Sequence, residues 1–403
     1  MNRVLFAARL CLKSQKLFLE EVSTVRDSVG LISPIGIPGN LNAIRVHPTL
    51  SRKVLTFSKR GARLLRQSLA AVIVVSCLVV SDVQCQRASS ASRAATSKRI
   101  FVFHNDELWL NLHHFLYVLG RAENKTTDSS RTAVVSAPKD EEEGLTKASP
   151  AEKLTWRKAV SFYANDLSKK DAVFDEPLPS ITNALAQAAD AKSLAQVKID
   201  PAVASVLESA APVYRKLWWR RHHTANVEWQ RAIQKLLDQH GDAILKFITT
   251  AYQMQWNPDG FHVHLSGYTN WAGAYSTTGE LLVVSSLSGD IKTSYGLETV
   301  FHEGMHQWDD DVFKILRQQA SKQNKSVPNG LSHAMIFFTA GEAVRHVLPG
   351  HVPYAEKFGV WQRGLAVLKP PLENVWKPYL DGKGTRDEAL AELIKRITIR
   401  VRI

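Results

Sequence analysis

The chain has 403 residues, of which 22% are charged, and a formal net charge of +13. Much of that charge lies near the N-terminus, where residues 1–85 hold twelve Lys and Arg against four Asp and Glu. The remainder carries only +5, which excludes a strongly basic body and argues against nucleic acid as a partner. The length is sufficient for one large domain or two ordinary ones.

The N-terminal segment is typical of an export signal. Basic residues between 59 and 66 precede an apolar run over 69–80, which is too short to span a bilayer. We therefore predict a doubtful N-terminal extension over residues 1–53 and a signal peptide over 54–85, with a membrane-anchored N-terminus as the alternative. The mature protein is then secreted or periplasmic and has no stable membrane span.

Cysteine usage agrees with this interpretation. Cleavage is expected after Cys85, and the other two cysteines, Cys11 and Cys77, precede it. The mature chain would therefore hold no thiol, which excludes both a disulfide framework and a cysteine-based metal site.

Residues 86–150 combine an arm, a short strand and helix, and a polar insert. A flexible arm over 86–98 leads to a strand over 99–104, and a helix follows over 107–121. His113 lies on this helix; a core position is the usual one for such a residue, and a place in a substrate cleft is the alternative. Residues 122–150 are polar and without a period, so we predict a surface loop or disordered insert.

A helical region follows over residues 151–240. Its expected helices cover 151–167 and 180–191, and Asp200 before Pro201 marks the start of another. Two more are expected over 227–240 and 242–254. A strand over 261–265 then places His262 and His264 on one side, as a polar sheet face or as a competing metal site.

The chemistry is concentrated in His302-Glu303-Gly304-Met305-His306, which follows a compact apolar strand over 280–287. Apolar residues recur at spacings of three and four around the motif and predict a helix with Ser294 as its N-cap. On a helix the two histidines lie on one face, about 5–6 Å apart at Cβ, where both can bind one metal ion. Glu303 lies beside them, where a carboxylate can take a proton from a metal-bound water.

Three acids follow the motif, Asp309 to Asp311, at what we expect to be the C-terminus of its helix. Cations are favoured there, so an acid at this position needs another partner. A hydrogen bond to the outer nitrogen of a ligating histidine is the use we predict for one of them.

A second helix is expected over residues 332–348, ended by Pro349 and Gly350. It carries Glu342 within an apolar run, where a carboxylate is costly unless it is paired or bound to metal. We therefore predict Glu342 as the third metal ligand. His346, one turn later, is a rival ligand or an oxyanion donor, and Tyr354 is a second candidate for that donor.

His333 and Tyr268 are further candidates for the oxyanion donor. Towards the C-terminus, Thr385 and Glu388 form a capping box that opens a helix running to about Ile397. This last part of the chain is expected to act as a lid or scaffold.

His302, Glu303 and His306, with Glu342 downstream, resemble the gluzincin group of zinc metallopeptidases over about residues 280–346. The chain lacks the third histidine of the metzincin pattern and has His346 where many gluzincins have aspartate. The resemblance implies a helix-rich α+β fold. It further implies that residues 241–403 form a zincin-like catalytic region with a small mixed sheet and an active-site helix. It also implies one Zn²⁺ per chain, Glu303 as general base, and strand 281–287 as the edge strand that pairs with an extended peptide substrate.

These observations lead to a predicted function with two rivals. The prediction is an exported zinc-dependent hydrolase, a metallopeptidase that cleaves peptide bonds by Glu303-assisted attack of zinc-bound water. The first rival is a catalytically silent zincin-like export protein that binds metal or a partner. The second is a structural or cell-surface binding protein in which the motif is accidental and no stoichiometric metal is present.

Overall fold

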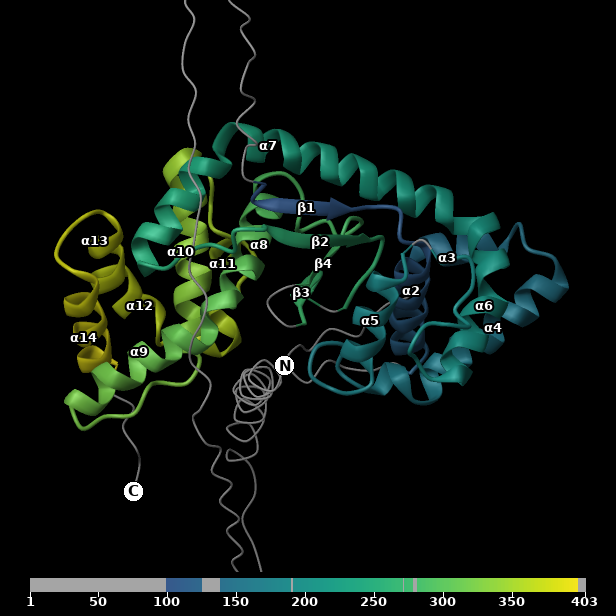
Figure 1. The fold of residues 1–403 in the computed structure, drawn as a ribbon, viewed down its shortest axis with the longest axis horizontal. Helices are drawn as coiled ribbons and strands as arrows, with labels where there is room; N and C mark the ends of the chain where they lie inside the picture. The colour runs from purple at the N-terminus through teal and green to yellow at the C-terminus, as the bar shows by residue number, and fades with distance from the viewer. Residues whose placement is uncertain (1–98, 125–137, 190, 271, 278–280, 398–403) are drawn as a thin grey trace, which may run out of the picture. The chain divides into compact units, whose positions relative to one another are not determined.

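The computed structural model describes residues 99–124, 138–189, 191–270, 272–277 and 281–397 (Figure 1). The expected N-terminal extension, the signal peptide with its cleavage after Cys85, and the arm over 86–98 lie outside the described residues. Within the described ranges the fold is α+β, with many helices and one small mixed sheet, as the sequence predicted.

The sheet of the described residues has four strands in the order β1-β2-β4-β3. Their bounds are Phe101–His104 (β1), Phe261–Ser266 (β2), Ala274–Ser276 (β3) and Leu281–Ser285 (β4). Strands β1, β2 and β4 are parallel, whereas β3 pairs with β4 in the antiparallel sense. The strand predicted over 281–287 is therefore not the edge strand: it is hydrogen-bonded on both sides, because β3 pairs with it and occupies the edge.

One face of the sheet packs into the larger of two main cores. Phe101, Val263 and Val284 are buried there, and the Phe101 ring lies 5.2 Å from that of Phe301. The helices around this core are α7 (Arg220–Tyr252), α8 (Ser294–Met305), α9 (Asp309–Lys322), α10 (Leu331–Val347) and α14 (Arg386–Arg396). The capping box predicted at the start of the last helix is confirmed, with Thr385 as N-cap.

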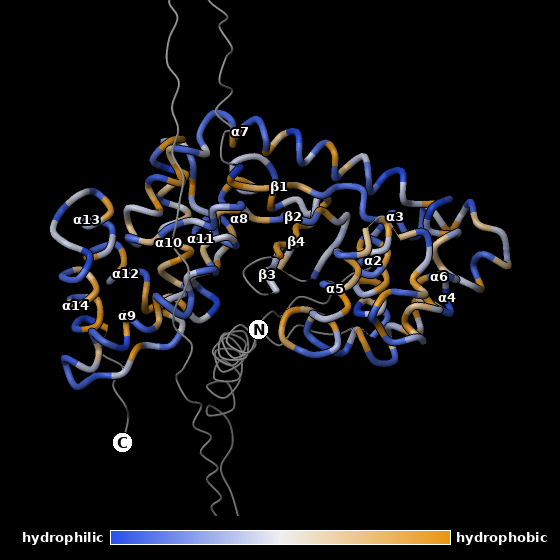
Figure 2. The backbone as a smooth tube through the Cα atoms, in the orientation of Figure 1, coloured by the Kyte–Doolittle hydropathy of each residue, from blue (hydrophilic) through white to orange (hydrophobic). Residues whose placement is uncertain are grey.

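Helix α7 runs beside the sheet without a break from Arg220 to Tyr252 (Figure 1). Its hydropathy alternates along the helix, as expected where one face is apolar (Figure 2). The prediction of two helices, 227–240 and 242–254, is wrong at Gly241, because this buried glycine lies where a Cβ would be 3.1 Å from the Ile100 side chain. The glycine permits close packing of the helix and does not end it.

A second core joins helices α2 (Leu108–Glu123), α4 (Pro150–Asn165), α5 (Leu178–Gln187) and α6 (Pro201–Tyr214). These helices agree with the predicted ones within a few residues, and Asp200 caps α6 by accepting a hydrogen bond from the Ala202 amide at 2.7 Å. The predicted polar insert over 122–150 contains a further helix, α3 (Lys139–Leu145). It is anchored by the buried Asp140, whose carboxylate accepts a hydrogen bond from Tyr268 at 2.7 Å and lies 2.9 Å from His222 Nε2.

The other elements are short. They are the 3₁₀ turns η1 (Leu167–Lys169) and η3 (His306–Trp308), the π-helical turns η2 (Arg215–Trp219), η4 (Trp361–Leu365) and η5 (Leu372–Trp376), and the helices α11 (Tyr354–Lys357), α12 (Lys369–Pro371) and α13 (Lys377–Leu380). In the part of the chain that the structure describes, no helix is both long and apolar enough to cross a membrane.

His113 occupies the second core and not a cleft: only 2% of it is exposed, and its Nδ1 is hydrogen-bonded to the Tyr163 hydroxyl at 2.9 Å. Burial lowers the pKa of His113 from 6.5 to about 3. Below pH 6.5 the unfolded chain therefore takes up a proton that the folded chain refuses, so this contribution to stability is present above pH 6.5 and is lost as the pH falls toward 3.

Lowering the pH from 7 to 5 protonates His113 in the unfolded parent but not in the folded parent. We therefore expect the parent to lose about 2 kcal/mol more of its free energy of unfolding over this range than His113→Gln loses. Urea titrations of both proteins at the two pH values measure this difference. His240→Gln, at a partly exposed position of α7, is the control and should follow the parent. An equal fall in parent and His113→Gln would show that His113 titrates normally in the folded protein.

Candidate metal centre

Helix α8 carries His302 and Glu303 of the motif near its C-terminal end, and other residues of α8 pack into the larger core. Leu297, Val300 and Phe301 are fully buried and fix the face of the helix that packs against the sheet. Gly304 lets this face approach closely, because a Cβ there would lie 2.5 Å from the Trp256 ring. Ser294 is not the N-cap: Thr293 precedes the helix with φ 56° and without a side-chain cap, and the Ser294 hydroxyl is instead 3.1 Å from His351 Nδ1.

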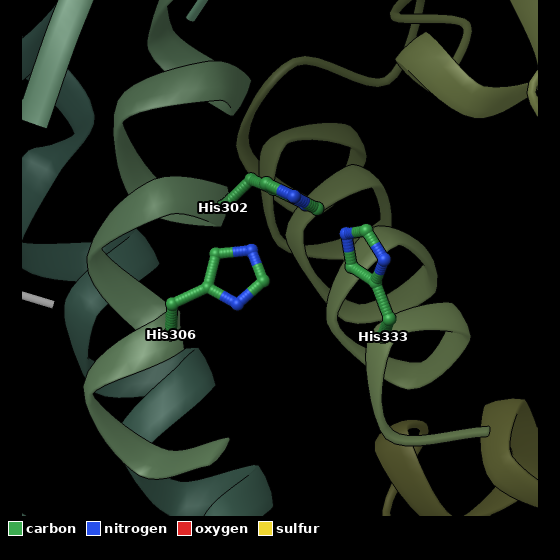
Figure 3. Close-up of side chains that lie close together, drawn as sticks. All are labelled: His302, His306 and His333. Atoms are coloured by element: carbon green, nitrogen blue, oxygen red, sulfur yellow. The ribbon is translucent and has the colours of Figure 1, made fainter. Parts of the chain in front are cut away.

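Three histidines come together at the end of this helix. His302 comes from α8, His306 from the 3₁₀ turn that continues it, and His333 from the first turn of α10. One nitrogen of each lies within 4.8 Å of the others. The rings point into the space between the two helices (Figure 3), with centroids 5.0 to 5.3 Å apart. We call these three residues the histidine cluster.

The antiparallel packing of α8 and α10 explains which residues meet. Near the start of α8, a Cβ on Gly341 would lie 3.2 Å from Glu298 Oε1. One turn later the ring of His302 lies 4.0 Å from that of Phe337, and the ring of His306 lies 5.1 Å from that of His333. Positions 333, 337 and 341, spaced four apart, therefore form the face of α10 that contacts α8.

Glu342, the predicted third ligand, does not belong to this cluster. It follows His333 by nine positions, which places it about 180° around the helix. Its carboxylate is buried, as expected, but its partners are Arg345 at 2.8 Å and Lys377 at 3.4 Å. The principle that a buried carboxylate needs a partner was correct, and the partner is a pair of cations.

His346 also lies away from the cluster. Its side chain is exposed, and its ring packs against that of Phe247 with the centroids 5.2 Å apart. It does not line the pocket that contains the three histidines. Tyr268 does not line this pocket either, and its hydroxyl donates a hydrogen bond to Asp140 of α3.

Glu303 faces the same pocket as the histidine cluster. It is buried, with 9% of its surface exposed, and its carboxyl group lies near the Ser276 side chain on the edge strand β3, close enough for a hydrogen-bonding interaction. Burial raises the pKa of the Glu303 carboxyl, while His306 and the interaction with Ser276 act in the opposite direction. The carboxyl group is thus held in place where it can exchange a proton with a molecule in the pocket.

Asp309 makes the contact predicted for one of the three acids. Its carboxylate is 2.9 Å from His306 Nδ1, which leaves Nε2 of that ring for another partner. We expected the three acids at the C-terminus of the motif helix, and this was wrong. They occupy the first turn of the next helix, α9, where negative charge is favourable. Although burial lowers it, the pKa of His306 is raised to about 9 by the Asp309 carboxylate.

The other two rings of the cluster are neutral at physiological pH. Burial lowers the pKa of His333 to about 3 and that of His302 well below its usual value. A neutral imidazole keeps a lone pair, so both rings are ready to bind a metal ion. His302 Nδ1 is buried and has no hydrogen-bond partner among the described residues.

The remainder of the pocket is largely apolar. Its lining side chains outside the cluster include Val173, Phe174, Ala272, Ala274, Tyr275, Ile291, Phe337, Val360 and Leu365. Tyr354 lies in it, as the sequence suggested: its hydroxyl donates to Asp290 at 2.8 Å, and its amide donates to Glu298 at 2.9 Å. The structure thus brings His302, Glu303, His306 and Tyr354 together and leaves Glu342 and His346 outside.

Two pocket residues were missed by the sequence reasoning. His333 was considered only as an oxyanion donor, although its position four residues before Phe337 on a predicted helix could have indicated a shared face. Asn270 was not considered; it lines the pocket, and its side-chain nitrogen has no hydrogen-bond partner within the described ranges. No sequence signal distinguishes it from an ordinary loop asparagine.

No protein-family model, curated protein or solved structure matches this chain. The candidate centre is therefore described by its own chemistry: three imidazoles, one buried carboxyl group and a mostly apolar pocket beside the edge of a sheet.

Proposed function

We propose that the protein is an exported zinc-dependent hydrolase, a metallopeptidase that acts on peptide or protein substrates. The observation that supports this most strongly is the gathering of three imidazoles from two helices in a pocket that also contains Glu303. The motif helix beside a small mixed sheet is in keeping with a zincin-like catalytic domain. The third ligand we propose is His333, which departs from the glutamate of gluzincins.

The residues present fit a zinc ion. Three imidazole donors with a fourth position open is the arrangement of catalytic zinc sites. Two of the rings are already neutral, and His306, whose pKa is raised by Asp309, would release its Nε2 proton when the metal binds. The buried Nδ1 of His302, without a partner among the described residues, is what a site awaiting a ligand would present. Asp309 holds the ring of His306 from behind, as carboxylates commonly do for zinc-bound histidines.

A zinc ion bound here would polarise a substrate carbonyl and lower the pKa of a water molecule. Glu303 then accepts the proton of the attacking water and delivers it to the leaving amine, a task suited to a carboxyl group whose pKa is raised by burial. Ser276 fixes its orientation. Asn270 can donate from its side-chain nitrogen to a substrate carbonyl, while the Tyr354 hydroxyl must first leave Asp290 to do so.

The substrate we propose is an extended peptide, bound along β3. Ala274, Tyr275 and Ser276 of this edge strand all line the pocket. An edge strand offers unpaired backbone groups to which a peptide can add as a further strand. The apolar lining favours uncharged side chains beside the bond that is cleaved.

The test is hydrolysis of a mixed peptide library by the zinc-loaded full-length chain, with new termini identified by mass spectrometry. Cleavage that stops with a chelator and returns with added zinc supports the proposal. Stoichiometric zinc without any cleavage would favour a catalytically silent metal-binding protein. Absence of bound zinc after reconstitution would favour the second rival, a structural or binding protein in which the motif is accidental.

Asp309→Ala is expected to weaken zinc binding by about 10- to 100-fold, because the ring of His306 loses the carboxylate that orients it. Competition with a chromophoric chelator measures the dissociation constant. Asp311→Ala, in the same helical turn, is the matched control and should bind zinc like the parent. Equal weakening in both variants would point to a general effect of charge and not to the hydrogen bond.

A further inference from the structure

A second group of histidines lies on the sheet face opposite α8. Along β1, Phe101 points toward α8, so His104, three residues later, points to the other side. His104 is directly opposite His264 of β2, and their rings stack with centroids 4.6 Å apart. The ring of His262 lies on the same face, with His262 Nδ1 2.8 Å from His104 Nε2.

Glu107, the residue before α2, completes this group, which we call the sheet-face cluster (His104, Glu107, His262 and His264). Both oxygens of its carboxylate lie 2.8 Å from His264 Nδ1. A metal ion bound here would replace the proton of this contact, with Nδ1 of His264 and one Glu107 oxygen both as ligands. One donor atom each of His104, Glu107 and His264 lies within 4.8 Å of the others.

The charge balance of the cluster favours a cation. Glu107 is 1% exposed, and a buried carboxylate is costly without a positive partner. Among the described residues it forms no ion pair with Lys or Arg, and its ion-pair partner is His264.

We propose that the sheet-face cluster binds a second divalent metal ion of the zinc class, with His104, Glu107 and His264 as ligands and His262 as the fourth. None of these residues lines the pocket of the histidine cluster, so the two sites are separate. His262 is exposed and gives the ion a route from solvent. Imidazole and carboxylate are ligands that zinc accepts, and four protein ligands define a closed, structural site.

Binding requires the donor atoms of the cluster to move into a tetrahedral arrangement. Donors of a tetrahedral zinc ion, each about 2.0–2.1 Å from the metal, stand about 3.3 Å apart. The 2.8 Å contacts of His104 with His262 and of Glu107 with His264 must therefore open slightly. The donors of His104, Glu107 and His264 now lie within 4.8 Å of one another and must close, and His262, outside that group, must turn toward them. Because the ligands come from β1, β2 and the start of α2, a bound ion would join these elements and stabilise the fold.

The experiment uses the full-length His333→Ala chain, in which the proposed catalytic site is disabled, equilibrated with zinc and measured by elemental mass spectrometry. We expect about one zinc ion per chain, lost when either His264→Gln or His104→Gln is added and kept when His240→Gln is added. Zinc should also raise the melting temperature of the His333→Ala chain, and this rise should disappear with the same two substitutions.

Each outcome decides the proposal. No zinc in the His333→Ala chain, or zinc retained with both His264→Gln and His104→Gln, overturns it. If His264→Gln fails to fold by circular dichroism, the exposed His262→Gln replaces it, with weakened binding expected and unchanged binding counting against the site. Because the His333→Ala background isolates this cluster, failure of the proposed hydrolase function is read separately, from zinc and activity in the His264→Gln chain, which keeps only the histidine cluster.

Discussion

Glu303→Gln is expected to lower the rate of peptide hydrolysis by about 10²- to 10⁴-fold while the zinc content of the protein stays that of the parent. Glutamine keeps the size and one hydrogen-bonding oxygen of the side chain, so it can still meet Ser276, but it cannot accept a proton. The loss should therefore appear in kcat, with little change in KM. Steady-state assays on a peptide identified from the library measure both constants.

The matched control for this substitution is Glu342→Gln. This carboxylate is also buried and lies on the neighbouring helix α10, but it faces Arg345 and Lys377 and not the pocket. We expect it to retain the parental rate per folded molecule. If Glu303→Gln turned over at the parental rate, another group would be the base. If parent and variant both held zinc and neither cleaved any peptide, the silent metal-binding protein would be the better description.

His333→Ala is expected to lower zinc affinity by more than about 100-fold, the upper end of the loss seen when a residue behind a ligand is removed. Its ring is one of three whose nitrogens gather within 4.8 Å, and its removal would leave a proposed site with two of its three protein ligands. Glu342→Ala should bind zinc like the parent. Zinc content after dialysis, with a competition titration for the dissociation constant, distinguishes the two variants.

This comparison decides between two assignments of the third ligand. Loss of zinc in His333→Ala with retention in Glu342→Ala supports the histidine cluster. The reverse result would mean that α10 rotates or repacks when metal binds. Because the sheet-face cluster is expected to hold its own ion, the measurement is made in the His264→Gln background, where only the first site remains.

Local patterns in the sequence predicted most of the helices and strands. Apolar residues three and four apart identified α8, and period-two alternation identified β2, because each burial pattern is a direct consequence of helix or strand geometry. An apolar run that ends at Pro349 and Gly350 identified α10. The chemistry within one helical turn was equally accessible. The positions of His302, Glu303 and His306 follow from their spacing, and the contact of Asp309 with His306 follows from a separation of three residues.

Relations between elements were not accessible in this way. The edge strand was misassigned because three residues, Ala274–Ser276, carry no pattern strong enough to reveal a strand that covers β4. Gly241 was taken as a helix end because a glycine that ends a helix and one that admits a neighbouring side chain look the same in a sequence. Both errors concern which element packs against which.

The histidine motif and its carboxylate neighbours are thus properties of the sequence itself, because every residue involved lies within one or two helical turns. The third histidine, the edge strand of the pocket and the sheet-face cluster were decided only by the tertiary structure. His333 and Glu342 lie on the same predicted helix, and only the antiparallel packing of that helix on α8 selects the face that reaches the site. A periodic pattern shows that a helix has a buried face, but not what it is buried against.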